Sequence, residues 1–299
     1  MSRKNDHENK GRQRRRRHPF RKFLLLVILA AFIITGYSRF IEPYLLTTSY
    51  DSLTSPYLTA SSLETGDDTG IPRLRIVLFA DTHFSEYYTP ENFAEVVSRI
   101  NSQDPDIVFF AGDLVDDLDS YEGSLEEIGS SLAGIKARIG KYAVYGNHDY
   151  GGGMQFKYPE VMAAGGFDLL VNETVDLADI NVCIMGIDDI VIGYGNAECA
   201  SWLDAGRCNI VVCHEPDVFD EMSGCNIDLM LSGHTHGRQI DLSIFDDYIL
   251  PAYGKKYVKG RYDLENERHT TLFVTSGIGM TKLPLRLASP PEVTVTDLT

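Results

Sequence analysis

The feature that most constrains the fold is a series of short apolar stretches, each followed at once by Asp, Asn or His. Such stretches are typical of buried strands. Further strands are predicted at residues 182–186, 271–275 and 292–296. The stretches and the residues that follow them are 73–80 with Asp81 and His83, 106–111 with Asp113, 141–145 with Asn147 and His148, 210–213 with His214, and 229–231 with His234 and His236.

The segments between the first strands have the apolar period of helices. Thr89 and Pro90 form a helix start, and apolar residues recur at positions 93, 96, 97 and 100. A second helix is predicted over residues 121–137. Alternating strands and helices indicate an α/β domain, in which ligand sites collect beyond the carboxyl ends of the strands. We therefore expect the polar residues to converge at one edge of the sheet.

The N-terminal region has the pattern of a membrane anchor. Residues 1–22 form a basic cytoplasmic segment, residues 23–40 a transmembrane signal anchor, and residues 41–70 a linker to a domain over residues 71–299. The charge-free run over 23–38 would span about 24 Å as a helix, and Lys22 and Arg39 could extend it by snorkelling. The positive-inside rule then places the domain outside the cytoplasm. A cleaved signal peptide and twin-arginine export remain alternatives.

Charge and cysteine content exclude some classes of function. The chain has 299 residues and a net charge of −16, although its first 39 residues carry 11 Lys or Arg. An acidic domain argues against a nucleic-acid backbone as the main partner and is compatible with metal cations. The five cysteines lack the C-x-x-C spacing of a zinc or redox site, so we expect buried apolar thiols, with a Cys199–Cys208 disulfide as an alternative.

The convergent residues form a mixed nitrogen and oxygen ligand set. Such sets bind Mn, Fe or Zn better than Mg or Ca. Asp113, the only donor of its loop in the set, is suited to bridge two ions through its two oxygens. The sequence therefore predicts two divalent metal ions held by Asp81, His83, Asp113, Asn147, His214, His234 and His236.

The order D-x-H, G-D, G-N-H-D, H and G-H-x-H resembles the calcineurin-like metallophosphoesterase superfamily, over about residues 73–297. The segments 214–217 and 233–240 look like the membrane-associated bacterial branch with phosphodiesterases and UDP-2,3-diacylglucosamine pyrophosphatase-like enzymes. Arg238 departs from that branch, where a second Gly is expected, and adds a cation beside the site. The resemblance implies a four-layer α/β/β/α sandwich, here preceded by one N-terminal transmembrane helix.

The resemblance also implies roles for the site residues. His148 would stand free of the metals, over the substrate phosphate, with Asp116 orienting it. One metal would be held by Asp81, His83 and His236, the other by Asn147, His214 and His234, with Asp113 bridging them. Asp149 is expected to brace its loop, and the pairs Asp188–Asp189 and Asp246–Asp247 to lie at the surface.

These features predict a membrane-anchored binuclear-metal phosphohydrolase. A hydroxide between the metals would attack phosphorus, and His148 would protonate the leaving oxygen. The expected reaction is that of a phosphodiesterase or pyrophosphatase, on an envelope or lipid-linked phosphoester. Two alternatives remain: the same chemistry on soluble nucleotides or phosphoproteins, and a non-catalytic metal-binding scaffold.

Overall fold

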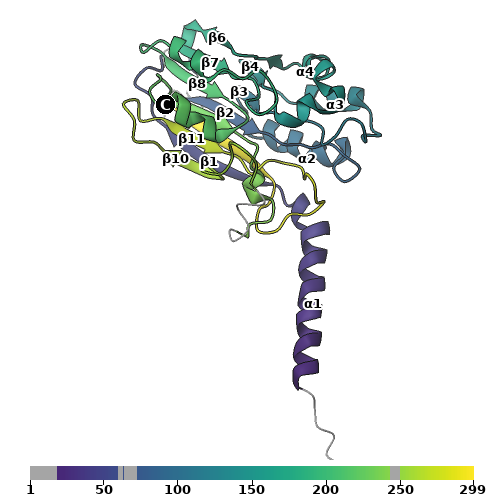
Figure 1. Ribbon diagram of the computed structural model, residues 1–299. Helices are drawn as coiled ribbons and strands as arrows, with labels where there is room; N and C mark the ends of the chain where they lie inside the picture. The colour runs from purple at the N-terminus through teal and green to yellow at the C-terminus, as the bar shows by residue number, and fades with distance from the viewer. Residues whose placement is uncertain (1–18, 60–62, 64–72, 243–249) are drawn as a thin grey trace, which may run out of the picture.

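The computed structural model describes residues 19–59, 63, 73–242 and 250–299, and shows two six-stranded sheets packed face to face (Figure 1). In the first sheet the strand order is β1-β12-β2-β3-β4-β5, and in the second it is β10-β11-β9-β8-β7-β6. The first sheet consists of β1 (Thr47–Leu53), β2 (Leu74–Phe79), β3 (Ile107–Phe110), β4 (Gly140–Ala143), β5 (Asp168–Leu169) and β12 (Glu292–Leu298). The second consists of β6 (Glu173–Leu177), β7 (Val182–Gly186), β8 (Cys208–Val212), β9 (Leu229–Ser232), β10 (Gly260–Asp263) and β11 (Thr271–Val274).

The central strands are buried on both faces, which explains their continuous apolar runs. In β2, Leu74, Ile76 and Leu78 face the second sheet, where they join residues of β8 and β9 in one apolar cluster. Val77 and Phe79 face the other way and pack beneath the helices. The strands β2, β3 and β4 are parallel, as are β7, β8, β9 and β11.

Helices cover the outer face of the first sheet. They are α2 (Pro90–Asn101), α3 (Leu125–Ala133) and α4 (Tyr158–Ala164). The helix predicted over 121–137 is shorter than expected, because Ser124 caps its start by accepting from the Glu127 N–H. On the outer face of the second sheet the structure has short 3₁₀ segments and the one-turn α5 (Phe219–Met222). The α/β/β/α order of layers is confirmed, with a thin fourth layer.

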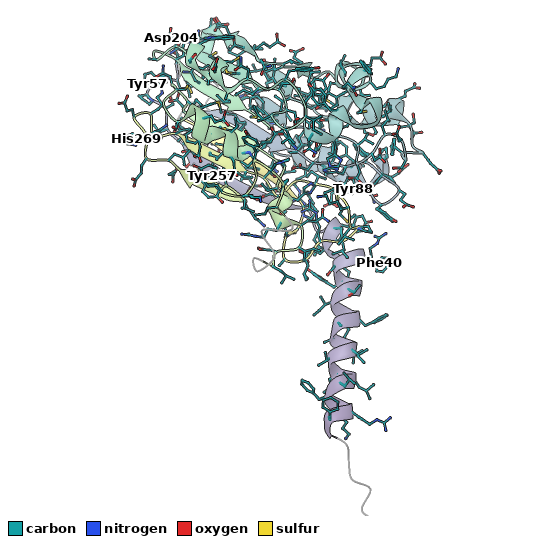
Figure 2. All side chains as sticks on the ribbon, in the orientation of Figure 1. Phe40, Tyr57, Tyr88, Asp204, Tyr257 and His269 are labelled. Atoms are coloured by element: carbon teal, nitrogen blue, oxygen red, sulfur yellow. The ribbon has the colours of Figure 1, made fainter. Side chains whose placement is uncertain are left out.

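The helix α1 (Pro19–Phe40) projects from one end of this body (Figure 1). Its apolar side chains point outward all around it, from Phe20 to Phe40 beside the body (Figure 2). In the described part of the chain, residues 20–44 are the one segment long and apolar enough to cross a membrane. The predicted apolar helix over 23–40 is thus present, although length and composition alone support a membrane span.

The linker expected over 41–70 is wrong for the residues that follow α1. Residues 47–53 form β1, which pairs in parallel with β12 along its whole length. The chain continues against the body, since Thr59 N–H donates to Ile180 O (3.0 Å) and Asn181 donates to Tyr57 O (2.8 Å). The alternating Ser, Thr and Tyr side chains of β1 suit an edge strand with one exposed face. Residues 60–62 and 64–70 lie outside the described residues.

The cysteines are free thiols, and no Cys199–Cys208 disulfide is present. Cys199, Cys208 and Cys213 are buried in apolar clusters, as expected for small apolar side chains.

Candidate metal centre and active site

The site is built from loops at the carboxyl ends of five parallel strands. Asp81 and His83 follow β2, Asp113 follows β3, Asn147 and His148 follow β4, His214 follows β8, and the pair His234 and His236 follows β9. Both sheets therefore contribute. The two sheets are joined at the site itself, because the Asp81 carboxylate accepts from the His234 N–H (3.0 Å).

Five of these residues have left-handed backbones, a conformation that non-glycine residues rarely adopt. The φ values are 55° at Asp81, 40° at His83, 62° at Asp113, 73° at His234 and 52° at His236. The glycines between the loops allow their close approach: a Cβ on Gly146 would lie 2.4 Å from Asp113 Oδ1. Such strain at clustered polar residues is typical of functional sites.

Two groups of donor atoms share Asp113, and a third, less buried group consists of His83, Asp116 and His148. Of the two that share Asp113, one is Asp81, His83, Asp113 and His236, and the other is Asp113, His214 and His234; within each group the ligand atoms lie within 4.8 Å of one another. Both of these groups are buried. Asn147 lines the same pocket as Asp113, His234 and His236. The structure thus brings together all seven residues that the sequence suggested as ligands.

Backbone carbonyls orient two of the imidazoles. Nδ1 of His214 lies 2.6 Å from Ala111 O, and Nε2 of His234 lies 2.7 Å from Ala252 O. A carbonyl only accepts, so each of these nitrogens donates its proton to it, and the opposite nitrogen is the one that can bind a metal ion. The buried Nε2 of His214 has no hydrogen-bond partner among the described residues and lies 3.2 Å from Asp113 Oδ2. This donor set fits a divalent cation.

Burial and neighbouring charges shift the pKa values of the acids and histidines in this cluster. Burial raises the pKa of Asp81 to about 6. Burial alone would lower the pKa of His83, but the carboxylates of Asp113 and Asp116 raise it to about 9. Burial, reinforced by the charge of His214, lowers the pKa of His234 to about 4. The carboxylates thus favour positive charge between them, which is the condition a metal cation satisfies.

His148 and Asp116 differ in detail from the expectation. The His148 N–H donates to Asp113 Oδ1 (2.8 Å), which ties the loop after β4 to the shared carboxylate. Nδ1 of His148 lies 2.5 Å from the backbone oxygen of Asp116, whereas the Asp116 carboxylate is 3.8 Å away. That carboxylate is closer to Nδ1 of His83, at 3.1 Å. The backbone of residue 116 therefore orients His148, and its side chain faces His83.

Asp149 braces the site, as expected. Its carboxylate accepts from the backbone N–H groups of Asp113 (2.8 Å), Leu114 (2.9 Å) and Gly146 (2.8 Å). The expectation for Asp188 and Asp189 is wrong, because both are buried. Asp188 accepts from the Tyr150 hydroxyl, and Asp189 accepts from the Gly193 N–H, so both carboxylates hold the loop after β7. Asp246 and Asp247 lie outside the described residues.

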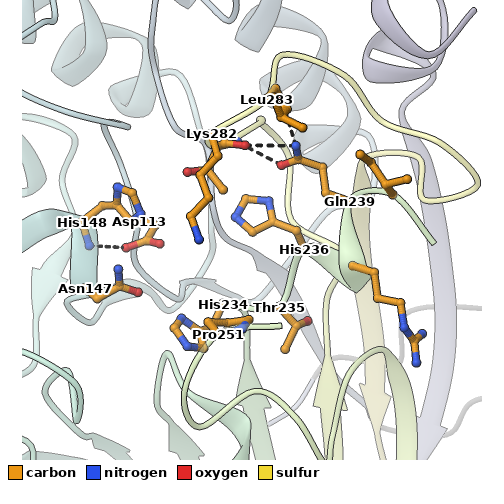
Figure 3. Close-up of a pocket in the computed structure, with 13 residues that line it drawn as sticks. Asp113, Asn147, His148, His234, Thr235, His236, Gln239, Pro251, Lys282 and Leu283 are labelled. Carbon is orange, nitrogen blue, oxygen red and sulfur yellow. Dashed lines mark hydrogen bonds between the residues drawn. The ribbon is translucent and has the colours of Figure 1, made fainter. Parts of the chain in front are cut away.

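A cavity of about 370 Å³ opens over the candidate metal ligands (Figure 3). One side is polar and includes Asp113, Asn147 and His148. The opposite wall consists of residues 238–240, where the sequence analysis had placed the Arg238 cation, and of residues 281–283, which it did not assign. Arg238 lines this wall with φ 74° and is paired with Asp241 at 3.3 Å, so the added cation is beside the site.

Comparisons with known proteins identify the family. Residues 74–238 match the family model described as calcineurin-like phosphoesterase. The chain belongs to this family. It is 36% identical to the uncharacterized metallophosphoesterase YkuE of Bacillus subtilis, over 88% of this chain and 89% of that protein. It is 29% identical to the phosphodiesterase YaeI of Escherichia coli, over 75% and 82% of the two chains.

A further relative is a transmembrane protein with a metallophosphoesterase domain from Danio rerio, 29% identical over 74% of this chain and 52% of that protein. Family membership and the donor cluster together make the chain a metal-dependent phosphoric ester hydrolase.

Proposed function

We propose that this chain is a membrane-anchored, two-metal phosphodiesterase or pyrophosphatase that acts on an envelope or lipid-linked phosphoester outside the cytoplasm. The observation that carries the chemistry is the pair of buried donor groups that share Asp113, with His148 beside them. The phosphodiesterase name of the Escherichia coli relative supports the reaction class.

Each site residue has a role in this proposal. Asp81, His83 and His236 would hold one ion, Asn147, His214 and His234 the other, and Asp113 both. When bound, divalent ions lower the pKa of water and neutralise negative charge on the phosphoryl oxygens.

Nδ1 of His148 carries a proton and donates it in a hydrogen bond to the Asp116 carbonyl. Nε2 is therefore the nitrogen that exchanges a proton with the leaving oxygen. The Asp116 carboxylate fixes the ring of His83.

The connection between α1 and the pocket supports a membrane substrate. Arg286 N–H donates to Ser38 O near the end of α1 (2.9 Å), and the neighbouring Leu287 N–H donates to Gln239 O in the pocket wall (2.9 Å). Leu283 at the pocket and Leu242 beyond its wall are 54% and 44% exposed. An apolar rim fixed beside an apolar helix suits a phosphoester carried by a lipid.

Turnover by the full chain in detergent tests the proposal. The protein is stripped with a chelator, reloaded with Mn, Zn or Fe, and assayed on bis(p-nitrophenyl) phosphate, p-nitrophenyl phosphate and a lipid-linked diphosphate. We expect metal-dependent turnover, fastest on the lipid substrate, and slower turnover in His148→Ala, with the smallest loss on the nitrophenyl esters. Lack of turnover on all three substrates with both metals bound would contradict the catalytic role.

A further inference from the structure

The wall of the pocket opposite His148 presents a lysine that neither the sequence motifs nor the proposed metal sites use. Lys282 lines the cavity together with Thr281 and Leu283. Its side chain points into the cavity, toward the side where Asp113 and His236 lie (Figure 3). An ammonium group directed at a phosphoester site is positioned to bind phosphoryl oxygen.

The backbone at Lys282 is held in an unusual conformation. Its φ is 61°, in the left-handed region, and Leu283 N–H donates across it to Thr281 O (2.6 Å). A turn of this kind with positive φ is rare in non-glycine residues. Backbone strain at a non-glycine residue clusters at functional sites, so the conformation supports a role for the direction of the lysine side chain.

Gln239, in the neighbouring segment of the same wall, fixes this turn through its side-chain amide. Its Nε2 donates to Thr281 O (3.1 Å) and Leu283 O (2.8 Å), and its Oε1 accepts from the Thr281 N–H (2.9 Å). Gln239 is buried, and it follows the His236 loop within three residues. The amide therefore locks the two residues that flank Lys282 to the loop that carries a metal-binding histidine.

We propose that Lys282 binds a non-bridging oxygen of the substrate's phosphoryl group and favours substrates with a second negative charge, with Gln239 as its positioning residue. The proposal rests on the phosphohydrolase function proposed above. Coulomb attraction scales with the charge of the ligand. A phosphate monoester dianion or a diphosphate therefore gains more from the ammonium than a diester monoanion does.

The test compares two substrates with the same leaving group, p-nitrophenyl phosphate and bis(p-nitrophenyl) phosphate, in metal-loaded full-length protein. We expect Lys282→Ala to raise the KM of the monoester about 10- to 100-fold, as for a lost charge-assisted hydrogen bond, and that of the diester less. The inhibition constant of inorganic phosphate should rise with the monoester KM. Lys282→Arg should recover part of the loss, and the matched control Lys255→Ala, an exposed lysine outside the cavity, should behave as wild type.

Gln239→Ala tests the positioning role. We expect a smaller rise in the monoester KM with the metal content retained, and little further loss when Lys282→Ala is added, because both changes remove the same interaction. Additive losses would show that Gln239 acts separately.

Three results separate the two proposals. Unchanged KM and phosphate inhibition in Lys282→Ala, with active wild type, would overturn the role of Lys282 alone. If Lys282→Ala binds anionic vesicles more weakly than wild type but phosphate inhibition is unchanged, Lys282 contacts the membrane and its phosphoryl-binding role is also overturned. A wild-type protein that turns over neither these substrates nor the lipid-linked diphosphate, yet binds phosphate more tightly than Lys282→Ala does, would refute the phosphohydrolase function and support phosphate binding by Lys282.

Discussion

Replacing His148 by alanine separates proton transfer from metal binding in this site. The imidazole lines the cavity, and its Nδ1 is fixed by the Asp116 carbonyl at 2.5 Å, which leaves Nε2 toward substrate. Its backbone N–H donates to the shared carboxylate of Asp113, and alanine retains that hydrogen bond. We therefore expect both metals to stay bound while turnover falls.

The expected loss is that of a general acid. Removing such a group costs roughly 10²- to 10⁴-fold in rate. This corresponds to about 2.7–5.5 kcal/mol of lost transition-state stabilisation. A leaving group that needs little protonation should lose less, so p-nitrophenyl esters should be less affected than alkyl esters of the same phosphate.

The assay measures kcat for aryl and alkyl phosphoesters, with metal content determined on the same samples. Asp116→Asn is the matched comparison, since its backbone carbonyl still orients His148 while its side chain no longer balances His83. We expect Asp116→Asn to lower the metal content. Its rate loss should be similar for aryl and alkyl esters. Loss of metal in His148→Ala, or equal rate losses for aryl and alkyl esters, would refute this division of roles.

Further predictions concern the shared ligand, the buried arginine and the topology. Asp113→Asn should lower the content of both metals and abolish turnover, measured by elemental analysis and assay; two tightly bound ions with full activity would remove Asp113 from the site. Arg286→Lys should destabilise the fold by about 2–4 kcal/mol, because carbonyls of Ser276 and Gly279 lose buried donors, seen as a melting temperature roughly 5–15 °C lower. A reporter active only outside the cytoplasm should work when fused after residue 299, and activity of a cytoplasmic reporter instead would reverse the proposed orientation.

The parts of the fold that sequence predicted are those with a periodic apolar pattern. The strand at 182–186 has the predicted bounds, and β2, β3 and β9 differ by a residue or two at their ends. These strands are buried on both faces, so apolar side chains are required at nearly every position. The residues after them could be predicted to converge because parallel strands end at a common edge.

The parts that sequence did not predict depend on pairing with distant segments. The strand β1 is polar and becomes a strand through its parallel pairing with β12, some 245 positions away. The second wall of the cavity also depends on contacts between segments that are distant in the sequence. Gln239 and Thr281 meet through side-chain hydrogen bonds between two irregular loops, and neither loop has a periodic signal. The positive φ of Lys282 could not be predicted from the residue type, because lysine rarely adopts this conformation. At Gly112 and Gly277 the glycine itself indicates that a positive φ is possible.

The loop over residues 276–289 connects α1 to the candidate metal site. On one side, the Ile278 and Gly279 N–H groups donate to the carbonyls of Ala80 and Asp81, which fixes the loop that carries Asp81 and His83. On the other side, Arg286 N–H caps Ser38 O of α1. The Arg286 guanidinium, fully buried, closes the loop on itself through Ser276, Gly279 and Ser289.

A rigid connection of this kind limits which substrates a membrane-bound site could reach. A long linker would let the cavity sample soluble and surface-bound phosphoesters alike. Here the Glu42 carboxylate also holds the Ser289 N–H (2.7 Å), so the chain enters β1 directly from the end of α1 without a free segment. If α1 spans a bilayer, the cavity lies at a fixed height above it, and phosphoesters at the headgroup level are favoured over those in solution. Inserting flexible residues between α1 and β1 would therefore slow turnover of a lipid substrate more than that of a soluble nitrophenyl ester.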